Sequence, residues 1–344
     1  MQKIQNGGKQ MNKKIILPVT EPCYGTYHYQ GSGAAIIGSN ESILNYYLNE
    51  CVDLYCNRNF LYSGITPDLG IVKSMYSVNP HLEKVEFSTK YLGEHIHHVI
   101  HSLLNDGFYV YYTGIDDYYL EGKTFYKEKH FKNDGMICGY DDKKKTYSVY
   151  AYDSNWEYRV FEVSQRSFEK GRVSKYIEND DAFITGLKPK TNHVNFSPWM
   201  VIRCIKQYLN SDFYIYPTYI AEEAYGLVVH EYLKMYLDKL ADGSIPKELM
   251  DRKVFRQFWE HKALMLKRIL KMEDELNMDT EFSGKYAPVV DLAKKIRVQY
   301  EKYRLRDQIE LLNNIKDSIT EICEKEKIIL KDFVEKTENI MLKR

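Results

Sequence analysis

The sequence has no excess charge of either sign. It contains 48 Lys and Arg residues and 48 Asp and Glu residues, so its formal net charge at neutral pH is +0. A strong overall field is what draws a protein to nucleic acid or to an anionic membrane. The balance therefore disfavours both as partners, although local patches of charge remain.

Long hydrophobic runs are also missing. No apolar stretch approaches the length that spans a bilayer, and the N-terminal "MQKIQNGGKQMNKK" lacks the apolar core of a signal peptide. We therefore expect a cytoplasmic protein with a flexible N-terminus over residues 1–14. Translation from Met1 and translation from Met11 both fit the sequence.

Cysteine pairs at short spacing are absent. The six cysteines are dispersed, with no CxxC motif, which favours a reduced chain over a disulfide scaffold or a zinc site: Cys23, Cys51, Cys56, Cys138, Cys204 and Cys323. His97 and His101 in "HIHHVIH" have the i, i+4 spacing of a helical zinc site, but no third ligand accompanies them at motif spacing. We expect a structural histidine face, with no metal and no cofactor.

Tyrosine is abundant, with 31 residues, many in runs such as "FYVYYTGIDDYYL". Tyrosine suits strands as well as half-hydrated pockets, so the content fits an aromatic β core or a ligand cleft.

A change in pattern divides the chain near residue 190. Helical and strand patterns alternate over 15–190, whereas 191–344 is almost entirely helical in pattern, and "GLKPKTNHVNFSP" between them is typical of a linker. The sequence predicts an α+β domain followed by an all-α helical bundle.

Within the first domain, apolar spacing predicts a helix in "SNESILNYYLNECVDLYC", with Ser39 or Asn40 as its N-cap. A second helix in "GEHIHHVIHSLLNDG" ends at Gly107 and leads into the strand "FYVYYT". The strands "MICGYD" and "TYSVYAYD" flank the charged turn "DKKK", and "WEYRVFEV" adds a third antiparallel strand.

The turn sets the register of this hairpin. A turn centred at Lys143 and Lys144 places positions 133 and 134 opposite 153 and 154. One polar surface at the open end of the hairpin should therefore hold His130, Asn133, Asp134 and Asp153.

The helical domain has apolar faces in "MVIRCIKQYL", "EEAYGLVVHEYLKMYLDKL" and "FRQFWEHKALMLKRILKMEDEL". From Val289 onward there is no Gly or Pro, which predicts one long helix or a helical hairpin. Such helices form a bundle, and they also suit a homodimer interface.

Five segments in this order carry a resemblance to a known family: "EPCYGTYHY", "NYYLNECVDLYC", "GIDDYYLEGKTFYKEKHFKNDGMICGYDD", "YAYD" and "FWEHKALMLKRI". Across most of residues 15–335 the chain resembles proteins with the butirosin-biosynthesis acyltransferase type of N-terminal domain. These are relatives of the papain-like cysteine peptidases that process bacteriocin leaders.

The resemblance implies a papain-like fold over 15–190 and an enzyme of bacterial antibiotic biosynthesis. It would move an acyl group from a carrier-protein thioester through an acyl-Cys intermediate to a small amine, forming an amide. An enzyme of this type joins acyl units to a diamine in the closthioamide pathway. The basic stretch "KKIRVQYEKYRLR" fits either an acidic carrier protein or an ordinary exposed helix face.

The same resemblance implies Cys23 as nucleophile, His130 as base and Asp153 as orienter, because a thiolate, an imidazole and a fixing carboxylate divide the work of acyl transfer. Related sequences carry a second His where this chain has Asn133. Three explanations remain. In the first, His130 is the base and the segment around it is bent and not extended. In the second, Asp153 or His28 assists a thiolate activated by a helix N-terminus. In the third, the site has lost turnover and retains binding.

Other assignments have two alternatives each. Asp116 and Asp117 either hold the amine by charge or form a surface acid pair, and Asp134 with Asn133 lines the site. Cys23 is either the nucleophile or a small buried apolar residue. At the level of the whole chain, the alternatives to a transferase are a cysteine peptidase or amidase of the same fold and a catalytically silent binding or self-resistance module.

Overall fold

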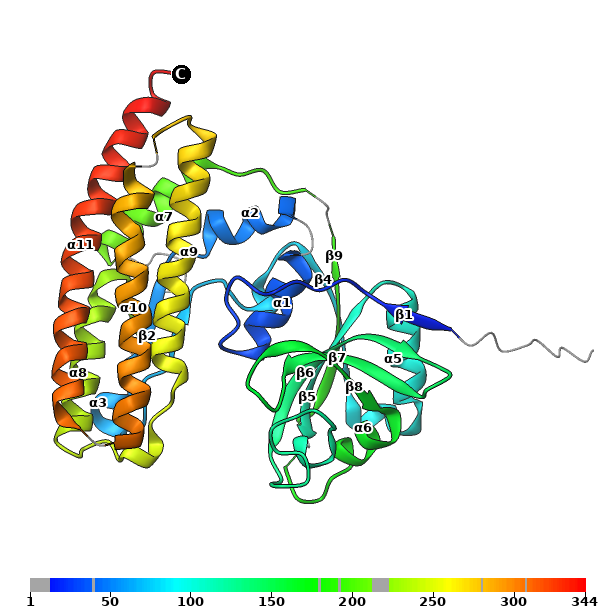
Figure 1. The fold of residues 1–344 in the computed structure, drawn as a ribbon. Helices are drawn as coiled ribbons and strands as arrows, with labels where there is room; N and C mark the ends of the chain where they lie inside the picture. The colour runs from blue at the N-terminus through cyan, green and yellow to red at the C-terminus, as the bar shows by residue number, and fades with distance from the viewer. Residues whose placement is uncertain are drawn as a thin grey trace, which may run out of the picture. The chain divides into compact units, whose positions relative to one another are not determined.

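The computed structural model describes residues 13–38, 41–178, 181–190, 193–211, 223–279, 281–306 and 308–344. The chain forms two compact units (Figure 1). Unit 1 contains 1–22, 32–39 and 80–190, and unit 2 contains 23–31, 40–79 and 191–344. The expected N-cap residues Ser39 and Asn40, and most of the N-terminus 1–14, lie outside the described residues.

The expected division at residue 190 needs a correction. A boundary does fall after Lys190, but 23–31 and 40–79 group with the C-terminal helices and not with the rest of 15–190. Strand pairing over long sequence separation causes this, because β2 (Leu54–Asn57) pairs with β10 (Glu223–Tyr225). A local change in composition does not reveal such pairing.

Unit 1 is built on one antiparallel sheet with the order β4-β9-β5-β6-β7-β8, and β1 is added to β6. Its strands are β1 (Lys14–Ile16), β4 (Leu82–Ser88), β5 (Tyr109–Asp116), β6 (Lys132–Asp141), β7 (Thr146–Tyr152), β8 (Tyr158–Ser164) and β9 (Phe183–Pro189). Its helices are α4 (Thr89–Leu92), α5 (Ile96–Asn105), α6 (Gln165–Arg172) and the Ser32–Gly38 part of α1 (His28–Gly38). The fold of unit 1 is therefore mixed, with helices and an antiparallel sheet.

The core of unit 1 lies between the sheet and its helices. Alternate residues of the strands face α5 and α6, as the period of two in a pleated strand requires. The fully buried members include Ile100 of α5, Phe168 of α6, Val110 of β5, Ile137 of β6 and Val149 of β7.

The predicted hairpin of β6 and β7 is confirmed. Tyr140 lies opposite Tyr147, as the turn predicted, but a bulge shifts the register beyond it and brings Met136 opposite Tyr150. Past the bulge β6 changes its other neighbour, since 132–137 pairs with β5 whereas 139–141 pairs with β1. Gly139 permits this change, because a Cβ there would lie 2.3 Å from the carbonyl oxygen of Ile15.

Unit 2 combines a helical bundle with the small antiparallel sheet β10-β2-β3. Its helices are α2 (Glu41–Glu50), α3 (Phe60–Ser63), α7 (Pro198–Asn210), α8 (Val229–Ala241), α9 (Lys253–Glu275), α10 (Glu281–Arg306) and α11 (Ile309–Met341), and its third strand is β3 (Leu69–Ile71). The long helices α9, α10 and α11 run side by side, with α8 against α11 (Figure 1).

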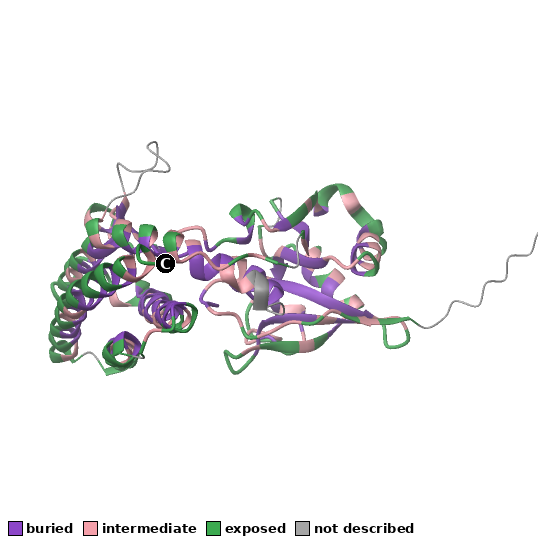
Figure 2. Cartoon of the chain, turned by 90° about the horizontal axis from the view of Figure 1, so that it is seen from above, coloured by how far each residue is buried: buried purple, intermediate pink, exposed green. Residues whose placement is uncertain are grey.

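The sequence-predicted helices of this unit are mostly present, with two corrections. The expected helix in 39–56 ends at Glu50 and gives way to β2, and the expected helix in 222–240 begins at Val229 because Glu223–Tyr225 is a strand. The region after Val289 is a helical hairpin of α10 and α11. Burial follows the helical periodicity: the inward faces are buried and the outward faces are exposed (Figure 2). Within the described residues, no helix combines the length and apolarity needed to cross a membrane.

Candidate functional site

A histidine and a carboxylate are paired at the end of β5. His130 Nδ1 lies 2.7 Å from Asp116 Oδ2. The His130 side chain is 30% exposed, whereas that of Asp116 is 0% exposed. A carboxylate oxygen only accepts, so the pairing places a proton on Nδ1, and in the neutral imidazole Nε2 is then the nitrogen with the lone pair. Among the described residues, Nε2 has no hydrogen-bond partner.

Asp116 is held by more than its histidine. Its Oδ1 accepts hydrogen bonds from the backbone N–H of Tyr118 and of Phe131, both at 3.1 Å. Its Oδ2 accepts a third from the Ser174 hydroxyl at 2.6 Å. A buried carboxylate needs such partners, and here they fix both the carboxylate and the imidazole that it orients.

Two tyrosine rings enclose the imidazole. The ring of Tyr118 stacks on His130 with centroids 4.3 Å apart, and that of Tyr176 stacks at 4.1 Å. The stacking restricts rotation of the imidazole while its edge remains exposed. A fixed imidazole with one accessible nitrogen is the arrangement that proton transfer needs.

A second polar cluster lies beside this pair. Asn133 Nδ2 donates to Asp117 Oδ2 at 2.7 Å, and the Lys123 ammonium lies 3.6 Å from Asp117 Oδ1. Burial raises the pKa of Asp117, although Lys123 and Asn133 oppose the shift, and burial lowers the pKa of Lys123. Asp134 accepts a hydrogen bond from the Tyr111 hydroxyl at 2.8 Å, and burial raises its pKa. Asp117 is therefore an internal ion-pair partner, which disfavours its expected alternative as a surface acid.

Asp153 is not the partner of His130. Its Oδ1 accepts hydrogen bonds from the backbone N–H of Asn155 at 2.8 Å and of Glu157 at 3.0 Å, and its Oδ2 pairs with Arg159. These contacts shape the turn between β7 and β8. The expectation that Asp153 orients His130 is therefore wrong. The carboxylate paired with His130 is Asp116, which the sequence analysis assigned either to binding of the amine or to a surface acid pair.

Cys23 and His28 belong to unit 2, whereas the other predicted site residues belong to unit 1. The Cys23 segment is fixed at Thr26, whose backbone N–H and hydroxyl both donate to Glu260 Oε2 of α9, at 3.1 and 2.7 Å. His28 is the first residue of α1. Cys23 precedes this helix by several residues and so lies outside its first turn.

Burial dominates the chemistry of the Cys23 thiol. It raises the pKa to about 12, against the opposing effects of the Lys267 charge and of the backbone N–H groups of Cys23 and Tyr24. The expectation of a thiolate activated by a helix N-terminus is therefore wrong for this resting structure. A base must remove the proton if the thiol is to act as a nucleophile.

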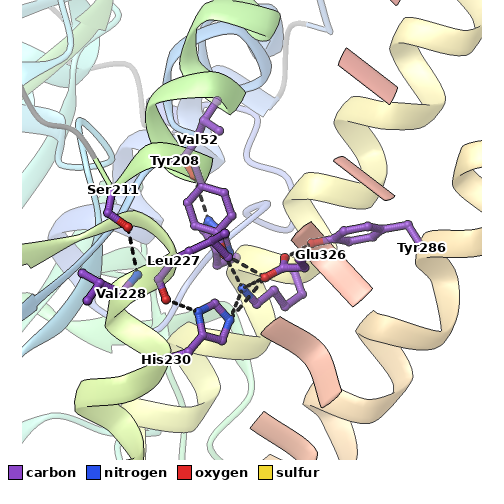
Figure 3. Close-up of polar contacts among 10 residues, drawn as sticks. Val52, Tyr208, Ser211, Leu227, Val228, His230, Tyr286 and Glu326 are labelled. Carbon is purple, nitrogen blue, oxygen red and sulfur yellow. Dashed lines mark hydrogen bonds and ion pairs between the residues drawn. The ribbon is translucent and has the colours of Figure 1, made fainter. Parts of the chain in front are cut away.

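Unit 2 contains a buried charged network that the sequence analysis missed. The Lys262 ammonium donates to Glu326 Oε2 at 2.8 Å, to the Tyr208 hydroxyl at 2.9 Å and to His230 Nε2 at 3.2 Å. Glu326 also accepts from the hydroxyls of Tyr208 and Tyr286 (Figure 3). Lys262, His230 and Glu326 are each 0% exposed.

The protonation states in this network follow from its geometry. His230 Nδ1 donates to the carbonyl of Leu227 at 2.9 Å, which leaves Nε2 to accept from Lys262. Burial alone would raise the pKa of Glu326, but the charge of Lys262 outweighs it and holds the pKa well below its ordinary range. Every donor of Lys262 is used, so the network is a structural one.

The signal for this network was present in the sequence. Glu326 occupies the buried stripe of α11 between Ile322 and Ile329, and Lys262 does the same in α9 between Phe258 and Met265. Charged residues at apolar positions of two helices predict a buried pair, but the spacing does not show which helices meet.

His97 and His101 have structural partners. His97 Nδ1 lies 2.6 Å from the Tyr147 hydroxyl, and the ring of His101 stacks on Tyr140 with centroids 4.1 Å apart. In the part of the chain that the structure describes, no group of three or more His, Cys, Asp or Glu side chains is arranged to hold a metal ion.

Comparison with known proteins gives no assignment: no family model matches the chain, and no curated protein is significantly similar to it.

Proposed function

We propose that the chain is a thiol-dependent acyltransferase with a papain-like arrangement. Cys23 accepts an acyl group from a carrier-protein thioester and passes it to a small amine. His130 is the base, and Asp116 orients it. The observation that carries this proposal is the 2.7 Å contact between His130 Nδ1 and the buried Asp116 carboxylate, which leaves Nε2 accessible.

The proposed chemistry has two steps. The base takes the Cys23 proton, the sulfur attacks the acyl carbon, and the donor thiol leaves with that proton. The amine nitrogen then attacks the acyl-Cys carbon, the C–S bond breaks, and the proton of the amine returns to the sulfur by way of the base. The raised pKa of the Cys23 thiol makes the base essential, because little thiolate exists at neutral pH.

Asn133 does not replace the base in this proposal. Its amide donates to Asp117, and its carbonyl oxygen accepts from the backbone N–H of Asp134 at 2.9 Å. An amide has no proton to exchange near neutral pH, so a positioning role for the second polar cluster fits these contacts.

A second candidate is a catalytically silent binding module. The raised pKa of the Cys23 thiol, caused by burial of its sulfur, and the amide at position 133 favour it over a peptidase. The two candidates differ in whether a covalent acyl-enzyme forms.

The test is intact-protein mass spectrometry after incubation with an acyl N-acetylcysteamine thioester and with an acylated carrier protein. The wild type should gain one acyl group, and Cys23→Ala should gain none. Cys51→Ala is the control for loss of a thiol, since Cys51 is a second free cysteine of the same unit. His130→Ala should slow acylation by about 100-fold or more, as removal of a general base does.

Addition of a diamine to the acylated protein separates the remaining alternatives. Amide product with loss of the adduct supports the transferase, whereas release into water at the same rate without amine supports a peptidase or amidase. No adduct from either donor, with folding unchanged, would establish the silent module instead.

A further inference from the structure

One face of α10 carries cations that are not neutralised. Lys294, Lys295, Lys302 and Arg306 are exposed, and none makes a hydrogen bond or ion pair with any residue that the structure describes. Successive steps of four, four and three residues place Lys294, Val298, Lys302 and Leu305 on one side of the helix. Together with Lys295 and Arg306 they form what we call the α10 stripe.

Much of the positive charge elsewhere on the bundle surface is neutralised. Several other lysines of unit 2 are paired with carboxylates: Lys206 with Glu338, Lys285 with Glu281, Lys316 with Asp238, Lys325 with Glu321 and Lys336 with Glu281. Within the helix, Glu301 is already paired with Arg304 at 3.0 Å, and the only acid one turn before Lys294 and Lys295 is Asp291, which no described ion pair joins to them. The positive charge of the stripe is therefore concentrated along about 18 Å of helix, from Lys294 to Arg306 at 1.5 Å per residue.

Apolar side chains lie between these cations. Val298 is 48% exposed and Leu305 is 74% exposed. A surface with exposed aliphatic groups between cations complements a partner that presents carboxylates around apolar residues.

We propose that the α10 stripe is the docking surface for a small acidic carrier protein, which contacts it through a helix bearing carboxylates and apolar side chains. This rests on the proposed function, in which the acyl group arrives on a carrier protein. Nucleic acid is the weaker fit, because the chain as a whole has a formal net charge of +0 and because aliphatic groups gain nothing against phosphates. A membrane surface fits less well still, since two exposed aliphatic residues bury little area in lipid.

The test measures binding of the full-length chain to a fluorescently labelled holo acyl carrier protein of bacterial fatty-acid synthesis. Lys294→Glu with Lys302→Glu should weaken binding on the order of ten-fold or more. Lys327→Glu with Lys343→Glu is the matched control, because it changes the net charge equally at exposed positions outside the stripe. Raising the ionic strength from about 0.01 M to about 0.15 M shortens the Debye length from about 30 to about 8 Å, and should weaken the wild-type complex most.

Acylation distinguishes this inference from the proposed function. The stripe variant should lose transfer from the acylated carrier protein but retain transfer from the N-acetylcysteamine thioester, whereas Cys23→Ala loses both and retains carrier binding. Equal effects of the stripe and control substitutions on carrier binding would overturn the inference. So would stripe-dependent binding to duplex DNA or anionic vesicles that is tighter than binding to the carrier protein. If no thioester acylates Cys23 but carrier binding still depends on the stripe, the docking surface stands and the transferase proposal fails.

Discussion

The ammonium of Lys262 and the carboxylate of Glu326 lie 2.8 Å apart with both side chains at 0% exposure. They come from α9 and α11 and join these helices directly, and the hydroxyls of Tyr208 in α7 and Tyr286 in α10 add hydrogen bonds to the pair. Removing water from two charges costs several kcal/mol each, so the pair is stable only because its hydrogen bonds are complete. Loss of one partner leaves the other charge uncompensated.

We therefore expect Glu326→Gln to lower the free energy of unfolding by about 3–5 kcal/mol, and Lys262→Met to have a comparable effect. The double variant should cost clearly less than the two single variants together, because neither charge is left alone. Urea unfolding followed by circular dichroism measures all three. Additive costs would mean that the pair is not coupled.

Asp116 and Asp153 give a direct comparison of two candidate orienters. Asp116→Asn removes the acceptor that places the proton on His130 Nδ1, so Cys23 acylation should fall by about 100-fold or more. Asp153→Asn weakens hydrogen bonds within a turn and should cost about 1–2 kcal/mol of stability with little change in acylation.

The acylation rates of the two variants are compared by mass spectrometry of samples quenched at successive times, at a temperature well below the melting temperature of either variant. The opposite ranking, with acylation lost in Asp153→Asn and kept in Asp116→Asn, would restore the orienter that the sequence suggested.

Alkaline pH should unfold the protein through its buried thiols and phenols. Burial raises the pKa of Cys23 to about 12 from an ordinary 9.0, and raises those of Tyr24, Tyr47 and Tyr208 well above 10.0. A raised folded-state pKa means that stability is complete below the unfolded-state pKa and is lost as the pH rises above it. Stability should thus decline from about pH 9 upward.

Ultraviolet absorbance of tyrosinate and circular dichroism monitor this transition together. We expect many tyrosines to ionise in one cooperative step that coincides with loss of helix. Gradual ionisation with the helix signal intact would show that these phenols reach solvent in the folded chain.

Substitutions at two glycines distinguish the free-energy cost of backbone strain from the cost of a steric clash. Gly226 and Gly243 both have positive φ, +70° and +77°. A Cβ at Gly226 would lie 2.4 Å from the carbonyl oxygen of Tyr208, whereas one at Gly243 meets nothing within 4 Å. Gly243→Ala should cost about 1 kcal/mol from strain alone, and Gly226→Ala several-fold more. Equal costs in thermal unfolding would show that the backbone near Tyr208 yields easily.

The sequence predicted the local features of the fold well. The β6–β7 hairpin follows from its turn and alternation, and α5 ending before Gly107 follows from its capping pattern. The β2–β10 pairing was missed because nothing local connects residues so far apart, and two of the predicted helix limits were wrong for that reason.

The candidate site was predicted in part. His130 was predicted to belong to the site, but the carboxylate that accepts its hydrogen bond was assigned wrongly. The chain between Asp116 and His130 folds back on itself, because the backbone N–H groups of Tyr118 and Phe131 donate to Asp116. Residue type and position in a hairpin do not reveal such a turn. The raised pKa of Cys23 was likewise hidden, since burial in the folded chain determines it.

The interrupted course of the chain through its two units has a consequence for synthesis on the ribosome. All segments of unit 1 have been synthesised once Lys190 leaves the ribosomal exit tunnel. Unit 2 can complete its fold only after α11 is synthesised, although its first segments, 23–31 and 40–79, leave the tunnel early. These early segments remain without partners until then, which is the period when a nascent chain is most exposed to misassociation. Expression of residues 191–344 alone should accordingly yield an incomplete bundle that lacks β2, β3 and α2.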